Sequence, residues 1–267
     1  MNSTTVLFIG DIVGKAGRQT VKALVPQLRS EYSAHLVIAN GENAAGGFGL
    51  TAAIADELFA VGIDVLTSGN HIWHQKDILE YLVKQPRLIR PLNCSPDAPG
   101  NGSCVVTASN GVRVAVINLL GRVFLDGYTC PFRAILSEVE RLREENALLF
   151  VDFHAEATAE KRALGWYLDG HVGAVVGTHT HVQTADEQIL PKGTAYITDV
   201  GMTGAMDSVI GVKKELAIQK FLTAMPVRFE AAEAMPELNG VVVTFNAETR
   251  RAVQIERLIR PLRSTMK

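Results

Sequence analysis

Short apolar runs and helical patterns alternate along almost the whole chain. Continuous apolar stretches of strand length predict the strands Val6–Ile9, Leu36–Ala39, Val65–Thr67, Leu148–Phe153, Ala174–Val176 and Tyr196–Thr198. Apolar residues at helical spacing predict helices over Gly17–Tyr32, Lys76–Val83, Ile135–Glu145, Thr158–Leu168, Lys214–Thr223 and a stretch that ends at Val61. Thr51 and Thr158 are the predicted caps of two of these helices. The alternation predicts an α/β fold.

Two further pairs of apolar runs predict antiparallel strands. Asn110 and Gly111 lie between the β-rich runs Cys104–Thr107 and Val112–Asn118, which predicts a hairpin. Val241–Phe245 and Val253–Leu258 predict a closing antiparallel pair. The chain shows no repeat, low-complexity segment or linker. We therefore expect a single domain over residues 1–267, with one mixed sheet and helices outside it.

Composition and charge narrow the class of protein. The chain has 267 residues, 26 Lys and Arg against 28 Asp and Glu, and a net charge of −2. This balance argues against a broad basic surface for duplex nucleic acid, although a local basic pocket stays open. No apolar run approaches the ~18 residues of a membrane span. The N-terminus lacks a signal-peptide pattern, and three widely spaced cysteines (Cys94, Cys104 and Cys130) suit reduced thiols, so we expect a cytoplasmic protein.

Metal-capable side chains follow one predicted strand after another. In chain order they are Asp11, Glu42, Asn43, Asn70, His71, His154, His179 and His181. Ligands collect outside the carboxyl ends of the strands in an open α/β sheet. These residues therefore predict a metal centre at one rim of the sheet. Oxygen and nitrogen donors without cysteine favour a catalytic cluster over a structural zinc site.

The donor set contains what a two-metal hydrolase requires. Such a site needs a carboxylate that bridges ions ~3.5–4 Å apart and further ligands for each ion. Glu42 is the predicted bridge, because it follows an inner strand between the loops of Asp11 and Asn70. Glycines beside the ligands allow sharp turns and a close backbone approach.

Other residues near these motifs have two interpretations each. Arg122 could bind phosphate in a bidentate manner or form a surface ion pair. Phe48, in the glycine-rich loop 46–49, could stack on a nucleobase, or the loop could be a flexible turn. Glu156 and Asp199 could orient metal-bound histidines or satisfy local backbone groups.

Longer motifs carry a family resemblance. The segments GDIVGKAGR, NGENAAGGFGLT, GNHIWHQKDI, VDFHAEATAEK, GTHTHVQTAD and TDVGMTG occur in this order. They resemble one branch of the calcineurin-like metallophosphoesterase superfamily along most of the chain. That branch contains the bacterial 2′,3′-cyclic-nucleotide 2′-phosphodiesterases.

The resemblance implies a fold and a ligand set. It implies a four-layer α/β/β/α sandwich with mixed sheets and two metal ions, with iron preferred and manganese as the alternative. The first ion would be held by Asp11, Glu42, Asn43 and His181, and the second by Glu42, Asn70, His154 and His179. The wider superfamily begins with Asp-x-His, whereas Ile12 and Val13 follow Asp11 here. Asn43 takes the place of the missing ligand, which makes the first site harder and suits iron or manganese.

The resemblance also implies an activity. A metal-bridging hydroxide would attack the phosphorus of a 2′,3′-cyclic nucleotide, and His71 would protonate the leaving oxygen to give a 3′-nucleotide. It implies a homo-oligomer as well. Alternatives from other classes are a broader phosphodiesterase or phosphatase, an endonuclease that acts on RNA or its ends, and a regulatory protein with a vestigial metal site.

Overall fold

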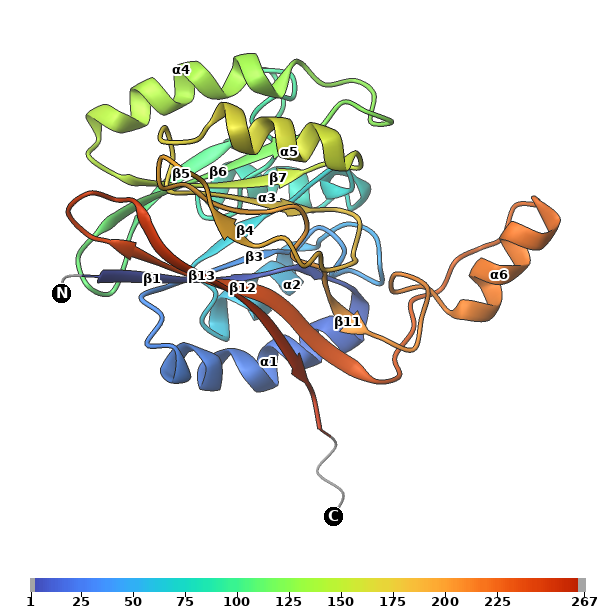
Figure 1. Ribbon diagram of the computed structural model, residues 1–267. Helices are drawn as coiled ribbons and strands as arrows, with labels where there is room; N and C mark the ends of the chain where they lie inside the picture. Colours follow the sequence, from blue (N-terminus) through green and yellow to red (C-terminus); the bar gives the residue numbers. More distant parts are fainter. Residues whose placement is uncertain (1–2, 264–267) are drawn as a thin grey trace.

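Two mixed sheets stack face to face and carry helices on both outer faces (Figure 1). The computed structural model describes residues 3–263, so residues 1–2 and 264–267 of the expected domain lie outside the described part. The four-layer α/β/β/α sandwich is therefore confirmed. The expectation of one mixed sheet was wrong, because apolar periodicity marks strands but does not say which of them share hydrogen bonds.

The first sheet has seven strands around a parallel centre. Its order is β2 (Asp11–Ile12), β11 (Met202–Ala205), β12 (Pro236–Asn246), β1 (Ser3–Ile9), β3 (Leu36–Asn40) and β4 (Val65–Thr67), with β13 (Ala252–Pro261) beside β12. Strands β1, β3 and β4 are parallel to one another, so their carboxyl ends lie at the same edge. The predicted closing pair is confirmed as β12 and β13, which are antiparallel.

The second sheet has six strands. Its order is β5 (Ser103–Thr107), β6 (Arg113–Leu120), β7 (Leu148–His154), β8 (Ala174–Thr178), β10 (Ala195–Ile197) and β9 (Gln188–Ile189). Strands β6, β7, β8 and β10 run parallel, whereas β5 pairs antiparallel with β6 and β9 pairs antiparallel with β10. The predicted Asn110-Gly111 hairpin is therefore confirmed. Gly111 has a φ of 85°, which a glycine adopts without strain.

Alternating side chains of the strands build three apolar layers. In β1, Val6 and Phe8 face the second sheet, whereas Leu7 and Ile9 face the helices on the other side. Phe8 stacks on Phe150 of β7, with ring centroids 5.6 Å apart. Because successive side chains of a strand point to opposite faces, each inner strand contributes to two layers. The sheets are thus buried on both faces, which explains their continuous apolar runs.

Helices cover the two outer faces. Against the first sheet lie α1 (Gly14–Glu31), α2 (Ala52–Ala60) and α3 (Ile78–Lys84), with the 3-10 helix η1 (Ile72–His74) before α3. Against the second sheet lie α4 (Pro131–Glu144) and α5 (Thr158–Tyr167). The sixth helix, α6 (Lys214–Thr223), stands away from the sandwich at the end of an excursion between β11 and β12 (Figure 1).

One predicted cap is confirmed and one is wrong. Thr51 caps α2, because its hydroxyl accepts a hydrogen bond from the backbone N–H of Ile54. Thr158 is instead the first helical residue of α5, and Ala157 holds the cap position without a side-chain hydrogen bond. A cap at Thr158 would require α5 to begin at residue 159, but the helix begins one residue earlier.

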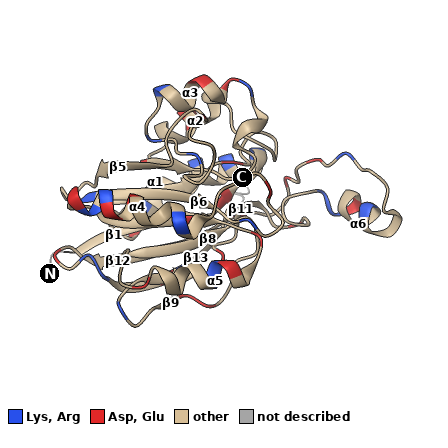
Figure 2. Cartoon of the chain, turned by 90° about the horizontal axis from the view of Figure 1, so that it is seen from above, with Lys and Arg blue, Asp and Glu red and all other residues tan. Residues whose placement is uncertain are grey.

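Opposite charges neighbour each other on the helices (Figure 2). On α4, Arg141 forms ion pairs with Glu138 and Glu145. This interleaving agrees with the balanced composition and differs from the one-signed stripe of a duplex-binding surface. Within residues 3–263, no helix is long and apolar enough to cross a membrane.

Candidate metal centre

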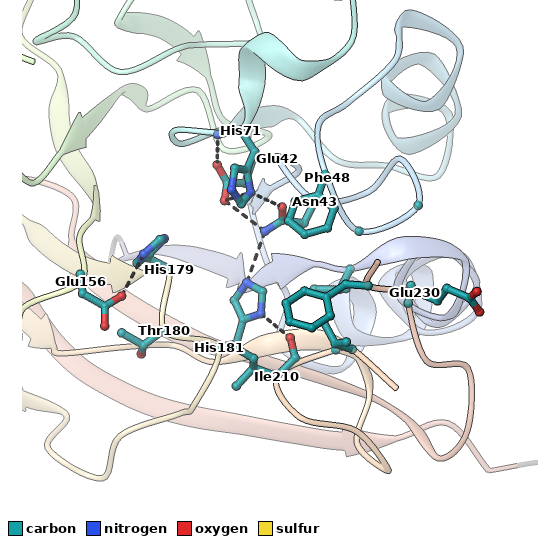
Figure 3. A pocket seen from close by; sticks show the side chains of 17 residues that line it. Glu42, Asn43, Phe48, His71, Glu156, His179, Thr180, His181, Ile210 and Glu230 are labelled. Atoms are coloured by element: carbon teal, nitrogen blue, oxygen red, sulfur yellow. Dashed lines mark hydrogen bonds and ion pairs between the residues drawn. The ribbon is translucent and has the colours of Figure 1, made fainter. Parts of the chain in front are cut away.

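The predicted ligands meet at one edge of the sandwich, and both sheets supply them. Asp11, Glu42 and Asn70 follow the parallel strands β1, β3 and β4 of the first sheet. His154 ends β7 and His179 follows β8 of the second sheet. Figure 3 shows side chains from both groups turned toward one space. The predicted ligands therefore meet at strand ends, at a rim that two sheets form instead of one.

Four side chains form the tightest part of the cluster. Glu42, His154 and His179 offer ligand atoms that all lie within 4.8 Å of one another. His154 Nε2 lies 3.1 Å from Glu42 Oε1, 3.0 Å from His179 Nδ1 and 3.2 Å from Asn70 Oδ1. These are the four residues predicted for the second ion. One carboxylate, one amide and two imidazoles form a donor set suited to a transition-metal ion.

The residues predicted for the first ion adjoin this group. His181 Nε2 lies 3.9 Å from Asp11 Oδ1 and 3.3 Å from Asn43 Nδ2. Asp11 Oδ1 is buried and has no hydrogen-bond partner among the described residues. A buried carboxylate oxygen without a partner is costly unless a cation compensates it. This orphaned oxygen fits a metal ion beside Asp11.

Asn43 is oriented differently from the prediction for a ligand. Its Nδ2 faces Glu42 Oε1 at 3.0 Å, and its Oδ1 faces His71 Nδ1 at 2.8 Å. An amide nitrogen carries two protons and does not bind a cation. Ligation through Asn43 Oδ1 therefore requires the amide to turn over, and it stays a prediction.

Burial and mutual charge set the protonation of the cluster. Burial opposes the charged form of Glu42, but His154 and His71 outweigh it and hold its pKa far below the ordinary value. Burial lowers the pKa of His154, yet Glu42 and Asp11 raise it to about 9. Burial and the nearby His154 lower the pKa of His179 to about 3. The buried carboxylates thus call for positive charge, which a metal ion would supply in place of the proton on His154.

A chain of hydrogen bonds orients His154 from behind. Its Nδ1 donates to Thr178 Oγ1 at 2.9 Å, and that hydroxyl donates to Asp152 Oδ1 at 2.7 Å. Asn40 Nδ2 donates to the other carboxylate oxygen of Asp152 at 3.1 Å. A proton on Nδ1 leaves the Nε2 lone pair directed at the cluster, which is the tautomer a metal ligand needs.

A strained turn carries the last two histidines. His179 and His181 have φ angles of 99° and 66°, a region that non-glycine residues rarely adopt. Between them, Thr180 donates through its N–H and its hydroxyl to Asp199 Oδ2, at 3.1 and 2.7 Å. Asp199 therefore orients the histidines through the backbone of the turn. Glu156 does so directly, since its Oε2 lies 3.0 Å from His179 Nε2.

Sequence reasoning missed Lys161, which completes this support. Its Nζ lies 2.7 Å from Asp199 Oδ2, and both side chains are only 1% exposed. A lysine at a helical position is ordinarily a surface residue, so the sequence carried no signal for a buried ion pair.

Gly69 is required by the packing of the ligands. A Cβ at this position would lie 2.3 Å from Glu42 Oε2 and 2.4 Å from His154 Nε2. The cluster therefore closes directly over the backbone that leads to Asn70.

His71 lies at the mouth of the cluster. Its backbone N–H donates to Glu42 Oε2 at 3.0 Å, and Nδ1 faces the Asn43 amide, whereas Nε2 has no hydrogen-bond partner among the described residues. Burial lowers the pKa of His71, although Glu42 opposes this effect. The ring packs edge-on against Phe48, with centroids 5.1 Å apart.

A cavity of about 290 Å³ opens beside the cluster. Its walls include Glu42, His71, His179 and Phe48, as Figure 3 shows. The excursion between β11 and β12 supplies a wall that sequence reasoning missed: Ile210, Gly211, Val212, Phe229, Glu230 and Ala231. Arg122 is not among the lining residues, and its backbone N–H donates to Glu160. Its role in phosphate binding stays a prediction.

The profile of the YmdB-like protein family matches residues 7–258. The chain belongs to this family. The predicted resemblance to the calcineurin-like metallophosphoesterases is thereby confirmed.

Relatives of this YmdB-like chain cover almost its full length. It is 51% identical over 254 residues to a 2′,3′-cyclic-nucleotide 2′-phosphodiesterase of Bacillus subtilis (strain 168). The alignment covers 95% of this chain and 96% of that protein. A hypothetical protein from Thermus thermophilus has a crystal structure with a TM-score of 0.89 and 41% identity, over 97% of this chain and 100% of that one. A novel phosphatase of Mycoplasma pneumoniae gives a TM-score of 0.90 and 39% identity, over 98% and 94%.

Proposed function

We propose that this YmdB-like protein is a metal-dependent phosphodiesterase that hydrolyses 2′,3′-cyclic nucleotides to 3′-nucleotides. The convergence of Glu42, His154 and His179 supports the metal-dependent chemistry. The name of the relative with 51% identity supports the substrate class. A site of hydrolysis also needs an open approach, and the cavity beside the cluster offers one.

We assign two metal ions to the cluster. Asp11, Glu42, Asn43 and His181 would hold one ion, and Glu42, Asn70, His154 and His179 the other. Oxygen and nitrogen donors suit iron, with manganese as the alternative. When bound, the ions would supply Lewis acidity toward the phosphoryl oxygens and activate the attacking water.

A side chain of the protein would protonate the leaving oxygen when the P–O2′ bond breaks. Water adds to phosphorus, the P–O2′ bond breaks, and O2′ takes a proton while the phosphate stays on O3′. His71 is our candidate for the proton donor, through Nε2, because Nδ1 faces the side-chain amide of Asn43. An alkoxide is a poor leaving group at neutral pH, so this proton transfer lowers the barrier to reaction.

We also propose a cellular location for the enzyme. Three free cysteines support a reducing compartment, and we infer a cytoplasmic enzyme. The homo-oligomer and the binding of RNA ends stay predictions.

Metal analysis of the purified protein, together with identification of the product from 2′,3′-cyclic AMP, tests the proposal. We expect about two iron or manganese ions per chain and 3′-AMP as the product. Glu42→Gln should lose both metal and activity, whereas Glu80→Gln, on the exposed surface of α3, should keep both. A product with the phosphate on O2′, or full activity without metal, would contradict the proposal.

A further inference from the structure

The cavity beside the cluster has two chemically different walls. One wall consists of cluster residues and their neighbours: Glu42, Asn43, His71, Glu156, His179, Thr180 and His181. The other wall, called the apolar wall below, consists of glycines and apolar residues together with Glu230: Val13, Gly46, Gly47, Phe48, Ile210, Gly211, Val212, Phe229 and Ala231. A small-molecule site commonly combines a few polar groups with an apolar surface.

Two segments that are distant in sequence build most of the apolar wall. The first is the loop after β3, where Gly46 and Gly47 have φ angles of 69° and 102°. The second is the base of the excursion that carries α6. There Val212 and Ala231 form an antiparallel bridge, which holds the two passes of the excursion side by side. This pairing joins the two passes of the excursion that contribute to the wall.

Several polar groups of the excursion wall already have partners. Gly211 O accepts from Ala232 N at 2.8 Å, and Glu230 O accepts from Lys213 N at 3.0 Å. Ile210 O accepts from His181 Nδ1 at 2.9 Å. The Glu230 carboxylate forms an ion pair with Lys213. These groups are therefore engaged within the protein, and the side chains of Ile210, Val212 and Phe229 offer a ligand apolar surface.

Each segment contributes one phenylalanine to the wall. Phe48 is 41% exposed and packs against His71 on one side. Phe229 comes from the excursion, where Lys220 Nζ lies 4.9 Å from its ring centroid. Lys220 belongs to α6, so the helix helps to hold the ring in place. Aromatic faces of this kind stack on any nucleobase, since every base has a π-face.

We propose that the apolar wall is a nucleobase subsite, in which Phe229 and Phe48 determine specificity for cyclic nucleotides over phosphodiesters that lack a base. The inference rests on the proposed function and deepens it. The wall takes the flat base, while the cluster side takes the cyclic phosphate. The wall recognises a base by the area that stacks on it and not by a pattern of hydrogen bonds. It therefore accepts all four bases and favours the larger purines. At about 290 Å³, the cavity suits a single nucleotide.

Kinetics on a matched pair of substrates test the subsite. The pair is 2′,3′-cyclic AMP and methyl β-ribofuranoside 2′,3′-cyclic phosphate, which keeps the reacting ring and lacks the base. With Phe229→Ala in the metal-loaded enzyme, KM for cyclic AMP should rise about tenfold, the effect of one lost stacking contact. The value of kcat for cyclic AMP and both constants for the riboside should stay unchanged. Phe229→Trp should restore the low KM.

A control and a binding measurement make every outcome decisive. Phe221→Ala removes an exposed phenylalanine of α6 outside the cavity and should change nothing. Calorimetry with adenosine 3′-monophosphate and ribose 3-phosphate should show base-dependent binding that Phe229→Ala weakens. If both substrates are hydrolysed and neither KM nor binding depends on the base, the subsite alone is overturned. Base-dependent binding without hydrolysis would overturn the proposed function alone, and loss of both would overturn both.

Discussion

The contact between His71 and Asn43 determines which ring nitrogen His71 could use in its proposed role as an acid. Nδ1 lies 2.8 Å from Oδ1 of the Asn43 amide, so this ring nitrogen is already engaged. Nε2 is the atom left for a leaving oxygen. In the proposed acid role His71 would therefore act through Nε2, and its backbone hydrogen bond to Glu42 holds it beside the candidate metal centre.

The proposed acid role of His71 predicts that the effect of its removal depends on the leaving group. We expect His71→Ala to keep its metal and to lower kcat/KM for 2′,3′-cyclic AMP about 10²–10⁴-fold. The loss for bis-p-nitrophenyl phosphate should be much smaller, because nitrophenolate departs without protonation. Parallel assays on the two substrates, with metal content as the control, check this. Equal losses on both would assign His71 to binding or to the metal instead.

Single residues also mark the limit of sequence reasoning. The imidazoles and carboxylates of the cluster were predictable, because each follows an apolar strand whose carboxyl end faces the same edge. The orientation of the Asn43 amide was not, since it depends on which neighbours donate and which accept. Burial of Lys161 was equally hidden, because only the folded structure places Asp199 beside it.

At the scale of elements, the turn after β8 depends on support from α5. Thr180 lies between two residues with positive φ and is held by Asp199, which is in turn neutralised by Lys161 of α5. A buried ion pair gains little over an apolar pair of the same shape, but breaking it leaves an uncompensated charge. The pair therefore couples the helix to the turn that presents His179 and His181.

This coupling predicts the effect of removing one charge. Lys161→Met should lower the free energy of unfolding by about 3–5 kcal/mol, because the Asp199 carboxylate stays buried and unpaired. The double variant Lys161→Met with Asp199→Asn should recover most of that loss. Urea unfolding measures both, with Lys84→Met in the exposed pair with Glu80 as the control. A Lys161 variant as stable as the control would refute the coupling.

Strands and helices followed the sequence closely, but their grouping did not. Local periodicity identified β1, β3, β4, β7 and β8, and the threonine cap of α2 was also correct. Neither signal contains information about partners, so the division into two sheets could not be read from it. That division came from the family resemblance. The base of the excursion was missed for the same reason, since its bridge joins distant residues.

At the scale of the whole molecule, the two sheets meet through an apolar layer and through the cluster at its edge. The layer consists of side chains such as Phe8 and Phe150, whose contacts are not directional. The cluster differs, because Glu42 belongs to the first sheet's edge and His154 and His179 to the second's. An ion held by these three would connect both halves of the fold.

Metal removal should therefore lower thermal stability as well as activity. A ligand at 100 times its Kd stabilises the folded state by about 2.7 kcal/mol. We expect the unfolding midpoint of the wild type to fall when the ions are stripped by a chelator and to recover when manganese is added back. Glu42→Gln should show no such response. Scanning calorimetry measures it, and a midpoint indifferent to metal would argue against ligands from both sheets.

The shared rim has a consequence for the life of the protein in a cell. An ion that cross-links the two halves makes their separation costly, and separation is the opening through which a protease reaches the buried strands. Under metal starvation the chain would open more often and be degraded faster. The amount of enzyme would then follow the supply of its metal without any dedicated sensor.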